Sequence, residues 1–347
     1  MKRRKRRSRR KKLTILTKLC IIADVLAICC FILFYGPWAG FRNLLINTAL
    51  KTKDHRYLAE VFYSEEAIQK VKSSNYFVTI DDDSDTDSII IDTREKDKYE
   101  NEYDKQILTR DGNNDDYKII DLKIGISNAK LIAIYEPTKV SLIRAQKFNS
   151  GAFGEQVTSM CKRYKGTICI NAGGFKDPTG TGSDIPNGYV IDDGKIVWPL
   201  NKWDTQKGNL IGFNEEGILM LLSKTTGIEA LEKGMKDAVE FGPFLIVNGK
   251  PLEIVGDPWG RSPRVAIAQR KDGVVLFLVI DGENYINGAT LQEMVDVLLK
   301  YGAYNAANLD GGHSASLSIN GKLANNPPSV AKKQGGRYVV TGFGLIP

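Results

Sequence analysis

The amino-acid sequence predicts an α+β protein, with mixed, largely antiparallel β-sheets and a few packed helices, preceded by one N-terminal transmembrane helix. Three observations lead to this prediction. A long apolar segment follows a basic tail, many short strand-like runs are separated by turn residues, and one strongly amphipathic helix stands between two strands. Apolar residues make up 42% of the chain, which is enough for a large core.

The N-terminal segment carries a basic tail and then a span of apolar residues. All residues from 2 to 12 except Ser8 are Lys or Arg, so the net charge of +7 belongs to this tail and the rest of the chain is slightly acidic. This distribution argues against a nucleic-acid-binding protein. Residues 13–36 are long enough to cross a hydrocarbon core of about 30 Å, although Asp24 lies within them.

The positive-inside rule places residues 1–12 in the cytoplasm and the chain beyond the span outside the cell, as in a single-pass membrane protein. A cleaved signal peptide is the alternative, but its apolar core is usually shorter and residues 36–40 make a weak cleavage site. Residues 37–116 are expected to form a helical stalk and a polar linker, because helical spacing of apolar residues gives way to an acidic run at 81–87. Packing of this region on the main domain, residues 117–347, is the alternative.

From residue 117 onward, short apolar runs alternate with turn residues. Four Asx-Gly pairs fall between such runs: Asp193-Gly194, Asn248-Gly249, Asp272-Gly273 and Asn320-Gly321. These pairs favour tight hairpin turns, because Asn, Asp and Gly tolerate the left-handed backbone that two-residue turns need. Hairpins join antiparallel strands, so the sequence favours antiparallel or mixed sheets over a doubly wound parallel sheet.

One helix is well specified by its ends and by its apolar face. Thr290 and Glu293 form a capping box, apolar residues then recur on one side, and Gly302 ends the helix. The strand before this helix ends at Asp281 and the strand after it ends at Asp310. We therefore expect two carboxylates side by side at the ends of neighbouring strands.

The loop at Asp310 has the composition of a binding site. An apolar strand delivers this carboxylate to Gly311, Gly312 and His313, and paired glycines let a backbone approach a ligand closely. A tight turn in which Asp310 caps the following backbone is the structural alternative. Two further cysteines, Cys161 and Cys169, lie outside the apolar span, where a disulfide is allowed but not required.

Several polar, glycine-rich elements occur in the main domain in a fixed order. They are an Asn-x-Gly-Gly-Phe element at Asn171, Asn187-Gly188-Tyr189, Gly242-Pro243-Phe244, Pro263-Arg264-Val265-Ala266, the block made by 279–282, 288–291 and 309–312, Asn326-Pro327, and Gly336-Arg337-Tyr338-Val339-Val340. In order and spacing they resemble the phosphodiester glycosidase family, and the resemblance covers about residues 117–347. It implies that these residues form a catalytic domain, which hydrolyses the bond between a sugar's anomeric carbon and a phosphodiester of the GlcNAc-1-phosphodiester type.

The resemblance and the chemistry of the residues together assign roles. Asp310 is the first candidate for the catalytic carboxylate, Asp281 the second and Glu283 the third, because a carboxylate can stabilise an oxocarbenium-like centre, attack it or activate water. Arg264 and Arg337 suit the phosphate oxygens, because a guanidinium binds them with two parallel hydrogen bonds. The other binding candidates are the backbone amides of Gly173, Gly174, Gly311 and Gly312 for the anion, Asn171 for a sugar hydroxyl and Trp259 for a sugar ring.

Each candidate has a structural alternative. Arg264 can pair with a surface carboxylate, Asp281 can cap a turn, and Trp259 can fill the core. His313 departs from the small residue that the family usually carries after the paired glycines. As the sole His of the main domain it is an acid–base candidate, although the family's chemistry does not require one.

No cofactor is expected, and a structural divalent cation held by Asp side chains is left open. The expected partners are a glycan phosphodiester and the membrane, in an architecture typical of bacterial cell-envelope or exopolysaccharide enzymes. Two other classes compete with this interpretation. One is a module that binds phosphoglycan without cleaving it, and the other is a metal-dependent phosphodiesterase that cuts the P–O bond, which the lack of a His/Asp ligand cluster disfavours.

Overall fold

The computed structural model describes residues 15–51, 56–96, 98–112, 115–177, 182–199, 205–282, 287–328 and 335–347. The chain divides into two compact units, Met1–Ser74 and Asn75–Pro347, which are taken in turn. The basic tail and the candidate Glu283 lie outside the described residues.

The first unit is helical, as the apolar spacing predicts. It contains α1 (Ile15–Tyr35), α2 (Ala39–Lys51), α3 (Arg56–Phe62) and α4 (Glu65–Ser73). Within α1, Thr17–Tyr35 is long and apolar enough to cross a membrane, a property that a signal sequence near the N-terminus shares. The other three helices enclose a small core that includes Ile46, Ala59 and Ile68.

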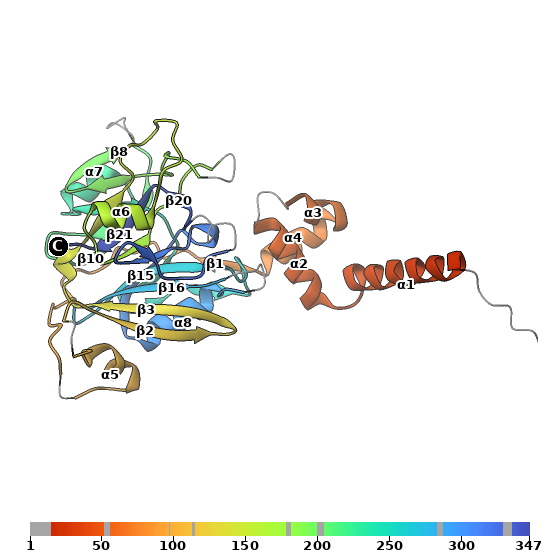
Figure 1. The fold of residues 1–347 in the computed structure, drawn as a ribbon, viewed down its shortest axis with the longest axis horizontal. Helices are drawn as coiled ribbons and strands as arrows, with labels where there is room; N and C mark the ends of the chain where they lie inside the picture. The colour runs from red at the N-terminus through yellow and green to blue at the C-terminus, as the bar shows by residue number, and fades with distance from the viewer. Residues whose placement is uncertain are drawn as a thin grey trace, which may run out of the picture. The chain divides into compact units, whose positions relative to one another are not determined.

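The second unit is built on three antiparallel sheets, which confirms the predicted α+β class (Figure 1). The largest has the order β13-β12-β17-β15-β16-β3-β2. Its strands are β2 (Tyr117–Ile124), β3 (Ser127–Ile134), β12 (Phe244–Val247), β13 (Lys250–Pro251), β15 (Arg264–Arg270), β16 (Val275–Ile280) and β17 (Ala303–Leu309).

Two five-stranded sheets complete the framework. One has the order β19-β18-β6-β21-β4 and the other the order β10-β9-β11-β7-β8. Their strands are β4 (Val140–Arg144), β6 (Ile168–Asn171), β18 (Leu317–Ile319), β19 (Lys322–Leu323), β21 (Thr341–Leu345), β7 (Val190–Asp192), β8 (Lys195–Trp198), β9 (Gly208–Phe213), β10 (Leu219–Thr225) and β11 (Asp237–Glu240). Two short ribbons pair β1 (Tyr76–Val78) with β14 (Glu253–Val255) and β5 (Glu155–Gln156) with β20 (Tyr338–Val339).

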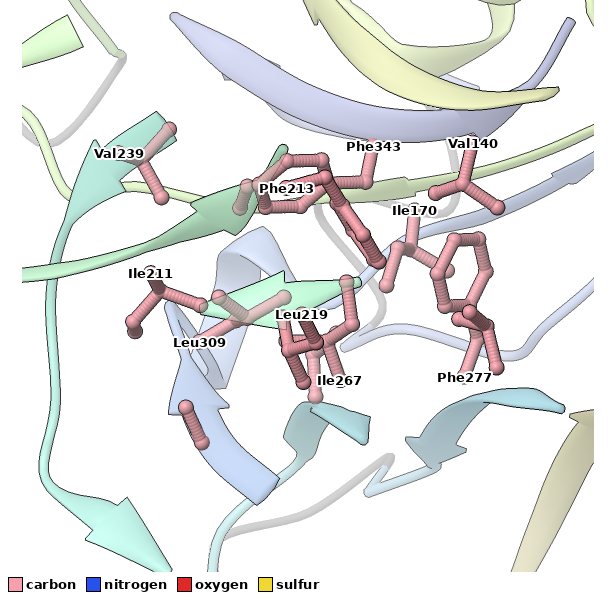
Figure 2. Packing of buried hydrophobic residues seen from close by; sticks show 14 of the residues in the cluster. Val140, Ile170, Ile211, Phe213, Leu219, Val239, Ile267, Phe277, Leu309 and Phe343 are labelled. Atoms are coloured by element: carbon pink, nitrogen blue, oxygen red, sulfur yellow. The ribbon is translucent and has the colours of Figure 1, made fainter. Parts of the chain in front are cut away.

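The main core lies where the three sheets meet. Figure 2 shows Phe277 of the seven-stranded sheet, Phe343 of the sheet that contains β21, and Phe213 of the third sheet among the side chains of one cluster. All three rings are almost fully buried, and the rings of Phe213 and Phe343 meet edge to face at 5.8 Å. Burial of apolar surface on this scale fixes the sheets relative to one another and so fixes the loops at their ends.

A second core lies on the other face of the seven-stranded sheet, where α8 (Leu291–Lys300) packs (Figure 1). The predicted capping box is confirmed, because the Thr290 hydroxyl accepts the Glu293 N–H and the Glu293 carboxylate accepts the Thr290 N–H. The helix buries Leu291, Met294 and other residues of its apolar face.

All four Asx-Gly pairs lie in hairpin turns, as predicted. Asp272-Gly273 joins β15 to β16 in a longer turn in which only Gly273 has positive φ. Both residues have positive φ in Asp193-Gly194, Asn248-Gly249 and Asn320-Gly321, as a type I′ turn requires. These turns join β7 to β8, β12 to β13 and β18 to β19.

The sheet-rich unit begins at Asn75, well before the expected boundary at residue 117. The segment 75–116 contributes β1 and α5 (Glu102–Leu108), whose Ile107 and Leu108 are buried in the second core. The acidic run is also held in place, since the Asp83 carboxylate accepts the Ser223 N–H at 2.8 Å and pairs with Lys233 at 2.7 Å. These contacts make the segment part of the sheet-rich unit and not a free linker.

The remaining helices are α6 (Val157–Arg163) and α7 (Gly227–Glu232). A disulfide joins Cys161 in α6 to Cys169 in β6. It closes the chain segment that leads into the Asn171 loop.

Candidate active site

The loop after β6 and the loop after β17 lie side by side, although β6 and β17 belong to different sheets. Asp310 donates its N–H to the Ala172 carbonyl at 2.8 Å. The Asn171 side chain donates to the Asp310 carbonyl at 2.6 Å and accepts the Ser316 N–H at 2.9 Å. Asn171 is 1% exposed, so its position supports a role in bracing these loops. It does not support the predicted contact with a sugar.

The glycines of the two loops are needed for close packing. A Cβ on Gly174 would lie 2.9 Å from the Phe241 ring, and one on Gly311 would lie 2.6 Å from the Pro263 carbonyl oxygen. Two amides that were expected to bind an anion already have partners, because Gly173 N–H donates to the Thr341 hydroxyl and Gly312 N–H donates to the Pro263 carbonyl. The glycines therefore shape the site more than they bind the ligand.

Asp310 is half-buried, and protein groups replace much of the water around its carboxylate. Loss of solvent raises its pKa to about 6, from a usual value of 3.8. The Ser314 hydroxyl, the Gly311 N–H and the charge of Arg337 oppose this rise, and the charge of Asp177 adds to it. A carboxyl group that titrates near neutral pH can change its protonation state during a reaction, as acid–base and nucleophilic catalysis require.

Arg337 and His313 complete a cluster of charged and titratable groups around Asp310. The Arg337 guanidinium pairs with Asp177 and lies over the Phe175 ring at 5.2 Å. Partial desolvation and the charge of Arg337 lower the pKa of His313, while Asp177 opposes the change. This shift favours the neutral His313 ring, and the positive charge that acts on the Asp310 carboxylate comes from Arg337.

Asp281 does not join this cluster directly. β16 and β17 both end at the start of β15, which runs between them, so the two carboxylates are not side by side as expected. Two strand spacings correspond to about 9.5 Å between the backbones. The Asp281 carboxylate accepts the Asn326 N–H at 2.7 Å, so it joins two loops that are far apart in the chain, a structural role different from the turn cap considered as the alternative.

Arg264 differs most from its expected role. Its side chain is 6% exposed and donates to the carbonyls of Ala289, Trp259 and Gly260 at 2.7–3.2 Å. Burial lowers its pKa to about 10, against the opposing charge of Asp257. A guanidinium held by three main-chain carbonyls fixes the loop before β15, which leaves Arg337 as the better phosphate ligand.

A cleft of about 790 Å³ opens beside these loops. Its lining combines flat rings and polar groups, among them Lys176, Asn187, Trp198, Glu240, Phe241 and Trp259. Trp259 was expected to stack on a sugar or to fill the core, and it both lines this cleft and packs on the second core. Aromatic faces with a few polar groups are typical of carbohydrate sites.

Several site residues were missed from the sequence. Lys176 and Asp177 directly follow the Asn171 element. Their position next to a glycine-rich loop is the sequence feature that indicates a place in the site. Ser314 lies within the Asp310 loop, but its hydroxyl received no role. Among the described residues, no three His, Cys, Asp or Glu side chains are arranged to hold a metal ion.

A family model for phosphodiester glycosidases matches residues 164–346, which contain Asn171, Asp177, Asp310 and Arg337. The chain belongs to the phosphodiester glycosidase family. Its members are glycosidases that act on phosphodiester-linked sugars.

Relatives of this chain include the SPbeta prophage-derived uncharacterized protein YomE of Bacillus subtilis (strain 168), which is 28% identical over 180 residues. The N-acetylglucosamine-1-phosphodiester alpha-N-acetylglucosaminidase of Bos taurus is 42% identical over 66 residues. The matches cover 50% and 19% of this chain, but only 27% and 12% of the two relatives.

The catalytic domain of the zebrafish N-acetylglucosamine-1-phosphodiester alpha-N-acetylglucosaminidase, auto-inhibited by its pro-peptide, has a similar fold. The TM-score is 0.54 at 23% identity, over 67% of this chain and 82% of that chain. This likeness shows that the phosphodiester glycosidase fold is shared.

Proposed function

We propose that this protein hydrolyses the bond between the anomeric carbon of a sugar and a phosphodiester, with a substrate of the GlcNAc-1-phosphodiester type. The proposal rests on the Asp310 carboxylate. Its pKa is raised to about 6, and the positive charge of the Arg337 guanidinium stabilises its ionised form. A carboxylate next to a cation suits a substrate that develops positive charge at carbon and leaves negative charge on phosphate.

The reaction needs little help from a strong acid, because a sugar phosphate leaves as a stable anion. Ionised Asp310 stabilises the oxocarbenium-like carbon, attacks it, or takes a proton from the water that attacks it. The water oxygen ends on the anomeric carbon, and the electron pair of the broken C–O bond leaves on the phosphate oxygen. Arg337 faces that oxygen, and Lys176 at the neighbouring cleft adds a second cation.

The cleft is the proposed place of the glycosyl group. Trp198 and Trp259 offer flat faces, and Asn187 and Glu240 offer hydrogen-bonding groups. Arg264 helps to position Trp259 at this cleft, because its guanidinium donates a hydrogen bond to the Trp259 carbonyl. Asp281 also has an indirect role, because its carboxylate holds the loop that contains Asn326.

We also propose that α1 anchors the protein, that residues 1–12 lie in the cytoplasm, and that residues 117–347 act outside the cell on an envelope or exopolysaccharide glycan. The basic tail before an apolar helix supports the orientation, and the Cys161–Cys169 disulfide suits an oxidising compartment. Protease treatment of intact cells should remove the sheet-rich unit. A cleaved signal peptide would instead release that unit into the medium.

The deciding experiment is hydrolysis of a GlcNAc-1-phosphate methyl diester in ¹⁸O-labelled water. The proposal expects free GlcNAc that carries the label and an unlabelled phosphomonoester. Label in the phosphate would support a metal-dependent phosphodiesterase. Binding of the diester without turnover would support a phosphoglycan-binding module.

A further inference from the structure

A second cavity lies at the far end of the strands that lead to Asp310. It has a volume of about 530 Å³, and its walls come from the segment that leads into α5, the β15–β16 turn, the end of α8 and the start of β17. β15 connects the two places, because Val265 pairs with Leu309, next to Asp310, and Arg270 pairs with Ala303 in the cavity wall. At about 3.4 Å per residue, the two ends of β15 are roughly 20 Å apart.

One wall of this cavity is built by chain that precedes the family region 164–346. Asn101, Asp104 and Leu108 belong to that wall. The Asn101 side chain caps α5, and Leu108 is buried in the second core. The wall is therefore firmly attached, and the cavity is a feature that this chain adds to the family domain.

Arg270 is the most buried cation of the lining, at 9% exposure. Its guanidinium pairs with Asp104 at 2.6 Å and with Asp272 at 2.8 Å, and it donates to the Tyr301 carbonyl at the end of α8 at 2.9 Å. Each of the two carboxylates also accepts a main-chain N–H. Asp104, Asp272 and the negative end of α8 thus already have their partners.

Four lysines of the lining are placed differently. Lys98, Lys271 and Lys300 are exposed and Lys96 is half-buried. None of the four forms an ion pair with a described carboxylate, although lysine ion pairs occur elsewhere in the sheet-rich unit. Glu100 is the remaining described carboxylate of the lining, so positive charge is in excess there. These ammonium groups are available to bind an anion.

We propose that this cavity is a second anion-binding site, which binds phosphate groups of a polymeric glycan phosphodiester away from the bond that is cleaved. The proposal rests on the proposed function, because a substrate with repeated phosphodiesters carries further phosphates beyond the one at Arg337. A span of roughly 20 Å exceeds one sugar phosphate, so a polymer reaches both places and a short diester does not. Ammonium groups on flexible stems suit phosphates whose positions vary along such a chain.

The ring in the cavity favours a glycan over a single-stranded nucleic acid. Proteins that bind single strands stack successive bases on aromatic faces. Tyr304 is the aromatic residue of the described lining, and the Lys271 ammonium lies 4.6 Å from the centre of its ring. A cation therefore covers the face on which a base would stack, and the same cation attracts a phosphate.

The first test measures binding without turnover. The full chain in a neutral detergent is titrated calorimetrically with poly(glycerol phosphate), which contains phosphodiesters but no glycosidic bond. Lys271→Gln/Lys300→Gln should weaken binding about tenfold and reduce the slope of log Kd against log salt by about 1–2. Lys271→Arg/Lys300→Arg keeps both charges and should keep the affinity. Lys195→Gln/Lys322→Gln, at exposed lysines of β8 and β19, removes the same charge and should bind like the wild type.

An equal loss of affinity in the Lys195/Lys322 variant would show an effect of net charge and overturn the site. Unchanged affinity in Lys271→Gln/Lys300→Gln would overturn it as well, whether or not any substrate is hydrolysed. Tighter binding of an oligothymidylate than of poly(glycerol phosphate), lost in the same variant, would assign the cavity to nucleic acid and contradict the glycan.

The second test measures hydrolysis. Lys271→Gln/Lys300→Gln should lower kcat/KM about tenfold at low salt for a polymer of GlcNAc units joined through 1-phosphodiesters. It should leave kcat/KM for the methyl diester unchanged, and equal losses on both substrates would contradict a site away from the cleaved bond. Binding that depends on Lys271 and Lys300, without hydrolysis of either substrate, would support the anion site and contradict the proposed function.

Discussion

Asp310 is the residue whose titration should govern the reaction. It must be ionised to act on the anomeric carbon or on water, and its pKa is about 6. We therefore expect kcat/KM to rise from pH 5 to pH 7 with a midpoint near 6, measured on the methyl diester. Asp310→Asn should abolish turnover.

His313 is the control for this profile, because it is a second titratable group of the site, and burial and the charge of Arg337 lower its pKa. His313→Gln should keep the midpoint near 6 if Asp310 is the titrating group. A profile that becomes flat in this variant would assign the midpoint to His313.

The raised pKa of Asp310 also predicts a pH-dependent effect on stability. The folded state binds the proton more tightly than the unfolded state, so the ionised carboxylate destabilises the fold above pH 6 and the effect disappears below pH 4. Asp310→Asn should raise the free energy of unfolding by up to about 3 kcal/mol at pH 8 and by little at pH 4. Denaturant unfolding at the two pH values measures this, and an equal change at both would refute the electrostatic cause.

Variants of Arg264 and Arg337 should differ in their effects: the Arg264 variant should mainly affect stability, and the Arg337 variant should mainly affect activity. Arg264→Met leaves three main-chain carbonyls without their donor, so it should lower the free energy of unfolding by about 2–4 kcal/mol. Arg337→Gln leaves the Asp177 carboxylate without its partner, so it should also lower the free energy of unfolding, but its loss of kcat/KM for phosphodiesters should exceed that of Arg264→Met. If Arg264→Met stayed stable and lost only affinity for phosphodiesters, the phosphate role expected from the sequence would be correct.

At the scale of single elements, α8 connects β16 to β17 and thereby positions Asp310. Thr290→Ala removes the hydroxyl that accepts the Glu293 N–H at 3.1 Å. This change should lower the free energy of unfolding by about 1 kcal/mol, measured by denaturant titration, without affecting kcat. Gln292→Ala on the exposed side of the same helix is the matched control and should cost less than about 0.5 kcal/mol.

The elements that could be predicted from the sequence are those with local signals. The capping box of α8 and the turn at Asn248-Gly249 depend on a few neighbouring residues, so their sequence specifies them. The contribution of 75–116 could not be predicted in this way. Its polar residues look solvated in sequence, yet Asp83 and Ser84 pair with β10, which is far away along the chain.

The candidate site shows the same division. Asp310 was identified because a strand and two glycines mark its position locally. The role of Arg264 could not be predicted, because its acceptors Trp259 and Gly260 come together with it only in the fold. The Arg337–Asp177 pair joins residues about half the chain apart, and no local pattern announces it.

At the scale of the whole molecule, the matched family region 164–346 is not the folding unit. β2, β3 and β4 precede it, and Leu131, Ile132, Ala133 and Ile134 of β3 are fully buried. A protein made of residues 75–347 should unfold cooperatively on heating, followed by circular dichroism. One that begins at residue 164 should aggregate or lack a thermal transition, and a cooperative transition there would refute this view.

Strand β21 has a consequence for how this protein is made. It lies between β4 and β6, and its Thr341 holds the Gly173 amide of the site. A nascent chain therefore displays the facing edges of β4 and β6 unpaired until residues 341–345 have left the ribosome, after every other strand of the three sheets. Until then the incomplete sheet is open to pairing with other chains, and the loops of the candidate site close only when β21 is inserted.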